Sequence, residues 1–171
     1  MKTKNLLKHT AMFVCAMLFA TLSFAQNKPV ESPRDSVSAK VGSATITINY
    51  GSPSVKGRKI WGELVPFDKV WRAGANEATT FTTDKDIMVE GKKLAAGTYG
   101  FFTVPTATTW IIVFNKVAKQ WGAYKYDESQ DALRVTIKPT SSAMNERLVY
   151  KINSQGFTLS WGKVTVPVKV K

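Results

Sequence analysis

Cysteine and histidine are nearly absent from the chain. Each occurs once, as Cys15 and His9, and both fall in a segment that we expect to be removed. The remaining chain then has no disulfide, no thiolate nucleophile, no histidine base and no cysteine or histidine ligand for zinc. Catalysis would have to use carboxylates, lysine, tyrosine, serine or threonine, and stability would rest on the hydrophobic core. We predict no metal and no cofactor.

Residues 1–25 have the three parts of a secretory signal peptide. Three lysines form a basic start, an apolar stretch follows, and the small residue Ala25 ends it. The stretch is shorter than the ~20 residues of a spanning helix, although an uncleaved membrane anchor is the alternative. A lipid anchor on Cys15 is excluded because the bulky residues 12–14 precede it. We therefore predict an exported protein, periplasmic or extracellular, whose mature chain has no integral membrane segment.

Basic residues outnumber acidic ones. Without the three lysines of the signal, the 24 basic residues become 21 against 12 acidic ones, a net charge of about +9. The basic residues are scattered, with no run beyond 56–59, which is typical of a solvated surface, and we expect no nucleic-acid partner. Residues 26–35 contain two prolines and read as a flexible lead-in, followed by one domain over 36–171.

Apolar and polar residues alternate with a period of two along most of this domain, as in half-buried strands. The pattern is clear over 43–50, 133–138, 147–152, 157–161 and 164–170, whereas 98–104 and 110–114 are apolar on both faces, as in covered central strands. Turn residues separate these runs, for example Trp161-Gly162-Lys163. We predict an all-β, single-domain antiparallel β-sandwich, with the jelly roll as one form of it and a closed β-barrel as the second choice.

Segment 51–78 interrupts this rhythm with glycine, proline, tryptophan and charged residues. It is long for a connection in a compact domain, and such loops are often functional or contain a short element. Its motifs are KGR at 56–58, LVP at 64–66 and WRAGANEAT at 71–79. Further motifs are AGTY at 96–99, FTVP at 102–105, Trp110, Asn115, WGA at 121–123, YD at 126–127, Asp131 and LRV at 133–135.

This order of motifs, from about residue 50 to 152, resembles a bacterial family catalogued as domain of unknown function 2911. Ala73 stands where threonine is more usual in that family, and Trp61 where phenylalanine is common. The resemblance implies an exported β-rich domain and implies no activity.

The candidate ligand site lies in 71–79 and has two interpretations. In the first, Trp71 stacks on a sugar ring and Arg72 forks onto a carboxylate or phosphate. In the second, Trp71 plugs the sandwich, Arg72 pairs with Glu77, and Asn76 bonds the loop's backbone. Lys56 and Arg58 either extend an anion-binding patch or are solvated surface. The candidate ligand-binding residues are Lys56, Arg58, Trp71, Arg72, Asn76, Glu77 and Thr79.

Acidic residues offer a weaker signal. Asp127, Glu128 and Asp131 share one turn and could act as paired carboxylates or bind calcium, but a plain solvated turn fits them better. Other possible acid–base residues are Glu63, Asp68 and Glu77.

Three functions follow from these patterns, in order of preference. The first is an exported binding module for a saccharide or a small anionic ligand. The second is a structural or assembly protein of the cell envelope, and the third is a carboxylate-dependent hydrolase. An open aromatic face at Trp71 or Trp61 would favour binding, and a covered one would favour a structural plug.

Overall fold

The computed structural model describes residues 31–171, which contain ten strands. The strands are β1 (Arg34–Val41), β2 (Ala44–Gly51), β3 (Thr79–Thr83), β4 (Ile87–Val89), β5 (Lys92–Leu94), β6 (Gly97–Pro105), β7 (Trp110–Asn115), β8 (Asp131–Ile137), β9 (Thr140–Asn153) and β10 (Gly156–Lys169). Within this range there is no α-helix, only the 3-10 turn η1 (Glu128–Gln130). The signal peptide predicted at 1–25 and residues 26–30 of the expected lead-in lie outside the described residues. β1 begins inside the segment expected to be lead-in.

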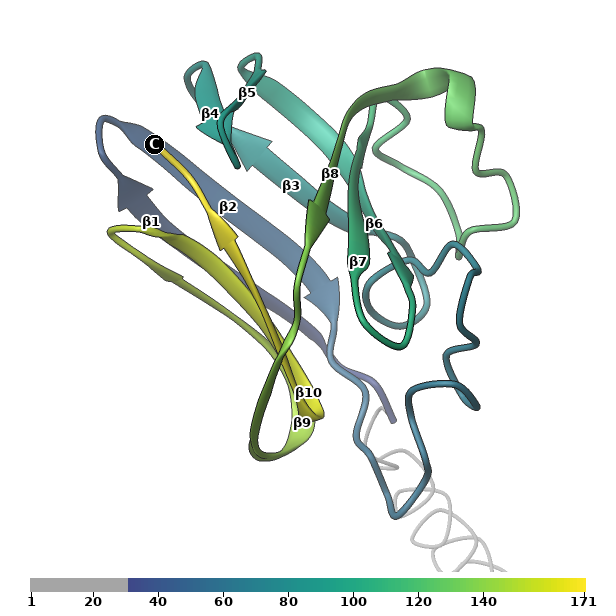
Figure 1. The fold of residues 1–171 in the computed structure, drawn as a ribbon. Helices are drawn as coiled ribbons and strands as arrows, with labels where there is room; N and C mark the ends of the chain where they lie inside the picture. The colour runs from purple at the N-terminus through teal and green to yellow at the C-terminus, as the bar shows by residue number, and fades with distance from the viewer. Residues whose placement is uncertain (1–30) are drawn as a thin grey trace, which may run out of the picture. The chain divides into compact units, whose positions relative to one another are not determined.

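The strands form three antiparallel sheets. Six strands pair in the order β1-β2-β3-β6-β7-β8, the long β9–β10 hairpin packs against this sheet, and β4–β5 is a small third sheet (Figure 1). None of these sheets closes into a barrel, so the predicted all-β sandwich is confirmed and the alternative of a closed barrel is not found.

The core lies between the six-stranded sheet and the hairpin. On β2 the side chains of Ala44, Ile46, Ile48 and Tyr50 are buried, as the alternation predicts. The hairpin supplies the facing side chains Leu148, Tyr150, Phe157, Leu159, Trp161, Val166 and Val168. Burial of each large apolar side chain contributes about 1.5–3 kcal/mol to the free energy of folding. This burial stabilises the described residues, among which there is no disulfide.

The outer face of the six-stranded sheet is also covered. Phe102 on β6 and Val113 on β7 are fully buried, and they pack in a second cluster with Ala78. Ala123 and Tyr126 pack on this cluster from the connection between β7 and β8. The prediction that 98–104 and 110–114 are covered on both faces is thus confirmed. One covering segment, which supplies Val70 and Ala78, is the connection that carries the candidate site.

The C-terminal strand corrects one expectation. A turn was expected at Trp161-Gly162-Lys163, but β10 runs through this position, and its register with β9 shifts on both sides of Gly162. Gly162 has φ of +59°, which a β-bulge uses as readily as a turn does. β10 is hydrogen-bonded to β9 in a two-stranded sheet and is therefore an edge strand, a position that tolerates Pro167 because proline has no amide N–H to donate.

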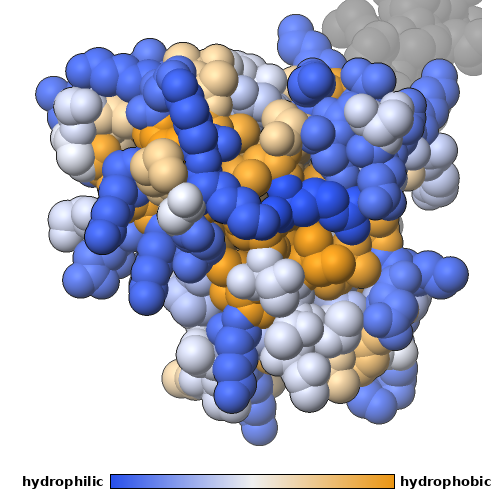
Figure 2. Space-filling view, turned by 45° about the horizontal axis from the view of Figure 1, so that its top comes forward, coloured by the Kyte–Doolittle hydropathy of each residue, from blue (hydrophilic) through white to orange (hydrophobic). Residues whose placement is uncertain are grey.

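On the surface, long hydrophilic side chains lie across an apolar area. Figure 2 shows long hydrophilic side chains crossing an apolar area on one face, an arrangement in which flexible stems cover carbon while charged ends stay in water. Within residues 31–171, no helix has the length and hydropathy needed to cross a membrane.

Candidate functional site

The long connection between β2 and β3 is fastened by isolated β-bridges. Ser54 pairs with Arg147 of β9, and Trp71 pairs with Thr103 of β6. The Trp71 amide donates to the Thr103 carbonyl at 2.8 Å, and the return bond is 2.9 Å. These bridges are the short elements that the sequence left unresolved. They fix the backbone of residues 52–78 on the sandwich.

Tryptophan side chains meet beneath this connection. Trp71 is 8% exposed and stacks on Trp161, with ring centroids 5.9 Å apart and an interplanar angle of 14°. Trp61 makes edge contacts with both of them and with Trp110. Trp71 therefore has no open face for a sugar ring, and its placement matches the plug of the second interpretation.

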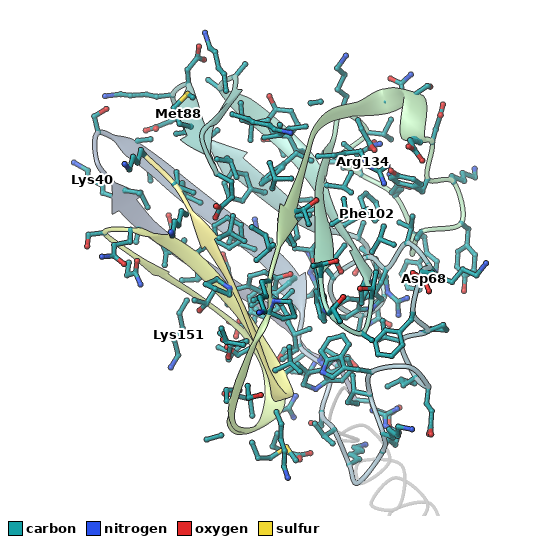
Figure 3. The ribbon with its side chains drawn as sticks, in the orientation of Figure 1. Lys40, Asp68, Met88, Phe102, Arg134 and Lys151 are labelled. Atoms are coloured by element: carbon teal, nitrogen blue, oxygen red, sulfur yellow. The ribbon has the colours of Figure 1, made fainter. Side chains whose placement is uncertain are left out.

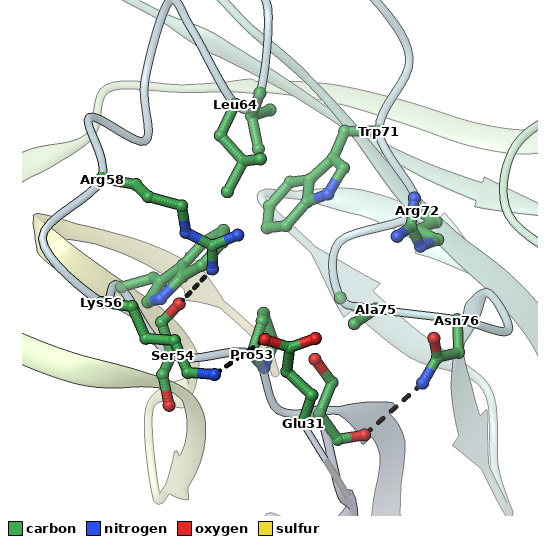
Figure 4. Close-up of a pocket in the computed structure, with 14 residues that line it drawn as sticks. Glu31, Pro53, Ser54, Lys56, Arg58, Leu64, Trp71, Arg72, Ala75 and Asn76 are labelled. Atoms are coloured by element: carbon green, nitrogen blue, oxygen red, sulfur yellow. Dashed lines mark hydrogen bonds and ion pairs between the residues drawn. The ribbon is translucent and has the colours of Figure 1, made fainter.

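A pocket of about 220 Å³ opens beside this cluster (Figure 4). Its lining residues are Glu31, Ser32, Pro53, Ser54, Lys56, Arg58, Leu64, Val65, Trp71, Arg72, Gly74, Ala75, Asn76 and Trp161. Five of the seven candidate residues are among them. Three lining side chains are cationic and one, Glu31, is anionic, so the pocket has an excess of positive charge.

Arg72 is one of two side chains of the pocket with a buried donor that has no partner. Its Nε is buried and has no hydrogen-bond partner, and no ion pair joins Arg72 to any described carboxylate. The expected pair with Glu77 does not form, because Glu77 instead contacts Arg34 at 3.4 Å. Burial lowers the pKa of the Arg72 guanidinium, an effect that nearby Tyr124 partly offsets; arginine nevertheless stays charged in proteins.

Trp161 carries a second buried donor. Its side chain is 2% exposed, and its indole Nε1 has no hydrogen-bond partner among the described residues. Sequence reasoning assigned Trp161 to a strand and missed its role in the pocket, because it reaches the site from β10. It also missed Glu31, which it placed in the lead-in. No local motif marks either residue.

The other two cations are held in place. Arg58 donates from Nε to the Val55 carbonyl at 3.0 Å and from one terminal nitrogen to the Ser54 carbonyl at 2.6 Å. Lys56 Nζ contacts a Glu31 carboxylate oxygen at 2.7 Å. Figure 4 shows the Arg58–Ser54 and Lys56–Glu31 contacts on one side of the pocket and Arg72 on the other.

Three of the predicted residues have other roles or places. Asn76 lines the pocket, and its side-chain amide donates to the Ser32 carbonyl at 3.5 Å. Glu77 lines a separate shallow hollow with Arg34. Thr79 is fully buried and donates to the Ala73 carbonyl at 3.0 Å. Glu77 and Thr79 therefore do not reach this pocket.

The backbone around the pocket is strained. Lys56, Ala73 and Asn76 have φ values of +47°, +52° and +64°, and non-glycine residues in this region concentrate at functional sites. The Ala73 carbonyl is held by Thr79 and by the hydroxyl of Tyr150, at 2.7 Å. Burial raises the pKa of Tyr150 well above its usual value, so this hydroxyl stays a donor.

The acidic turn is bonded within itself. Asp131 accepts from Tyr126 at 2.5 Å and from Arg134 at 3.0 Å. Glu128 pairs with the same arginine at 3.0 Å, and Asp127 caps η1 by accepting from the Ser129 amide. In residues 31–171 no group of three or more side chains is placed to hold a metal ion. Of the other acidic candidates, Glu63 pairs with Lys59 at 3.0 Å, and neither it nor Asp68 lines the pocket.

Comparison with known proteins identifies the family of the chain. No curated protein and no solved structure matches the chain. A family profile described as "Protein of unknown function (DUF2911)" matches residues 32–170, a longer span than the motifs between 50 and 152. The match covers both sheets of the sandwich and all but one residue of the pocket lining. The chain therefore belongs to the DUF2911 family.

Proposed function

We propose that the pocket binds a small anionic ligand whose acidic group is taken by Arg72. The observation that carries the proposal is the buried Arg72 Nε without a partner. A buried donor left unpaired costs about 1–3 kcal/mol, and such groups in a native protein call for an explanation. A carboxylate or phosphate oxygen would satisfy this donor, and a guanidinium fork is suited to both.

The rest of the pocket supports the same ligand class. The Trp161 indole is a second unpaired donor at the pocket, and Lys56 and Arg58 add positive charge around it. The volume of about 220 Å³ falls below the ~300–1,000 Å³ of pockets for drug-sized ligands. The ligand is therefore small, of the size of a single acidic sugar or an organic acid. An exported location, periplasmic or extracellular, is part of this proposal and rests on the sequence of residues 1–25.

A structural role in the cell envelope is the second proposal. The burial of Trp71 against Trp161 favours it, since a plug needs no ligand. The carboxylate-dependent hydrolase has less support, because the described lining of the pocket contains Glu31 as its one carboxylate, whereas glycoside hydrolysis uses a pair.

Calorimetric titration with glucuronate, citrate and phosphate, and with neutral glucose as reference, tests the binding proposal. We expect heat from at least one anion and none from glucose. Arg72→Lys keeps the charge and loses the planar fork, so it should weaken binding by about 1–3 kcal/mol. Arg34→Lys, outside the pocket, is the matched control and should bind as the wild type does. If no anion binds, the binding proposal is wrong and the structural role is the proposal that is left.

A further inference from the structure

A basic aromatic surface lies on the connection between β7 and β8. We define it by its exposed members Lys116, Val117, Lys119, Trp121, Tyr124 and Lys125. Trp121 is 62% exposed and Tyr124 is 86% exposed. Scattered exposed aliphatic residues are ordinary on proteins, but two large aromatic side chains this open within four positions are not.

The backbone beneath this surface is held firmly. Trp121 forms a bridge with Glu77, the Gly122 amide donates to the Asn76 carbonyl at 3.0 Å, and the Ala78 amide donates to the Gln120 carbonyl at 2.9 Å. Ala123 and Tyr126 anchor the same segment in the cluster around Phe102; Figure 3 labels Phe102 on β6. The exposed rings are thus presented by a fixed backbone that needs little ordering on contact.

The three lysines give this surface an uncompensated positive charge. Lys116, Lys119 and Lys125 form no ion pair with any described carboxylate, and the nearest acidic residues along the chain are already engaged. Asp127 accepts from the Ser129 amide, and Glu128 pairs with Arg134. The chain as a whole carries a formal charge of +12.

We propose that this surface docks the domain peripherally onto a lipid bilayer with anionic headgroups. Tryptophan and tyrosine combine an apolar ring with a polar end and are enriched where hydrocarbon meets water. Lysine is attracted to anionic headgroups, and its stem lies along apolar surface. A saccharide-binding surface would also need exposed amide or acid groups that bond to sugar hydroxyls. The Gln120 side chain does not supply one, because its amide nitrogen donates to the Val117 carbonyl and its amide oxygen is buried.

Vesicle binding by the purified exported protein tests the proposal. We expect co-sedimentation with phosphatidylcholine vesicles containing phosphatidylglycerol, and much weaker binding to phosphatidylcholine alone. Replacing Trp121 or Tyr124 by alanine should weaken binding at least about tenfold, and each lysine-to-alanine change about fivefold. The controls are Met144→Ala and Lys151→Ala, both at exposed positions of β9; Figure 3 labels Lys151. Both variants should bind as the wild type does.

Fluorescence gives a second readout. The other tryptophans are buried or half-buried, so brominated lipid should quench mainly Trp121, and Trp121→Phe should remove that quenching. Arg72→Lys should leave vesicle binding intact, which separates this surface from the anion pocket. Failure to bind anionic vesicles, or equal losses in the control variants, would overturn the proposal. Binding to an acidic polysaccharide through the same residues without vesicle binding would also overturn it.

Discussion

Replacing Arg72 by methionine should stabilise the ligand-free domain. Arg72 Nε is a buried donor without a partner, and such a group costs about 1–3 kcal/mol. The side chain as a whole is half-buried, so solvent relieves part of the cost, and we expect the free energy of unfolding to rise by about 1 kcal/mol. Methionine keeps an unbranched stem and introduces no donor.

Arg58 offers the same substitution with the opposite expected sign. Its guanidinium donates to the Val55 and Ser54 carbonyls, and Arg58→Met removes both bonds. Hydrogen bonds from charged groups contribute about 1.5–3 kcal/mol, but this side chain is exposed. We therefore expect a loss of about 1–2 kcal/mol.

Urea denaturation of both variants and the wild type measures the two effects. A change in midpoint with an unchanged slope reports stability alone, and each kcal/mol corresponds to roughly 3–4 °C in Tm for a domain of this size. Arg72→Met should unfold at higher urea than the wild type, and Arg58→Met at lower urea. If Arg72→Met is destabilised as much as Arg58→Met, Arg72 supports the fold and the reasoning from its unpaired nitrogen is wrong.

Other changes probe the pocket and its supports. Glu31→Gln removes the carboxylate beside Lys56, so calorimetry should show anion affinity rising by about two- to fivefold. The free energy of unfolding should change by less than about 1 kcal/mol, because the ion pair is exposed. Tyr150→Phe removes one of two donors to the Ala73 carbonyl and should lower stability by about 0.5–1.5 kcal/mol in urea; an unchanged midpoint would show that this bond contributes nothing. Gly51→Ala would place a Cβ at 2.2 Å from the Ala75 carbonyl oxygen, so it should cost about 1–3 kcal/mol and weaken anion binding. If residues 1–25 are removed as predicted, the remaining chain has no cysteine, so reducing agents should leave its Tm unchanged; a large drop would contradict removal of that segment.

The alternation of side chains was sufficient to predict the fold class. It located β2, β8 and the central pair β6–β7, because burial on one face or both faces leaves a direct mark on the sequence. It failed at Gly162, where a bulge and a turn require the same glycine. β1 escaped notice because its burial is shallow.

The pocket was predictable only in part. Local motifs marked Lys56, Arg58, Arg72 and Asn76, which lie on one connection. The burial of Trp71 depends on Trp161, and the charge balance depends on Glu31, and both residues approach from distant parts of the chain. The predicted pairing of Glu77 with Arg72 was wrong for the same reason, since Glu77 pairs with Arg34 of β1, which is distant along the chain. Contacts of this kind follow from the strand order, which spacing along the sequence does not reveal.

The pocket's two unpaired donors can be observed directly by nuclear magnetic resonance. In a ¹⁵N-labelled sample, the Arg72 Nε–H and the Trp161 indole N–H each give a separate signal. Titration with an anion that binds in calorimetry should move both signals together in a saturable way, while the indole signal of exposed Trp121 stays in place. Arg72→Lys should shift the Trp161 response to higher anion concentration. If both signals stay fixed while the anion binds, the ligand lies elsewhere and this pocket is not its site.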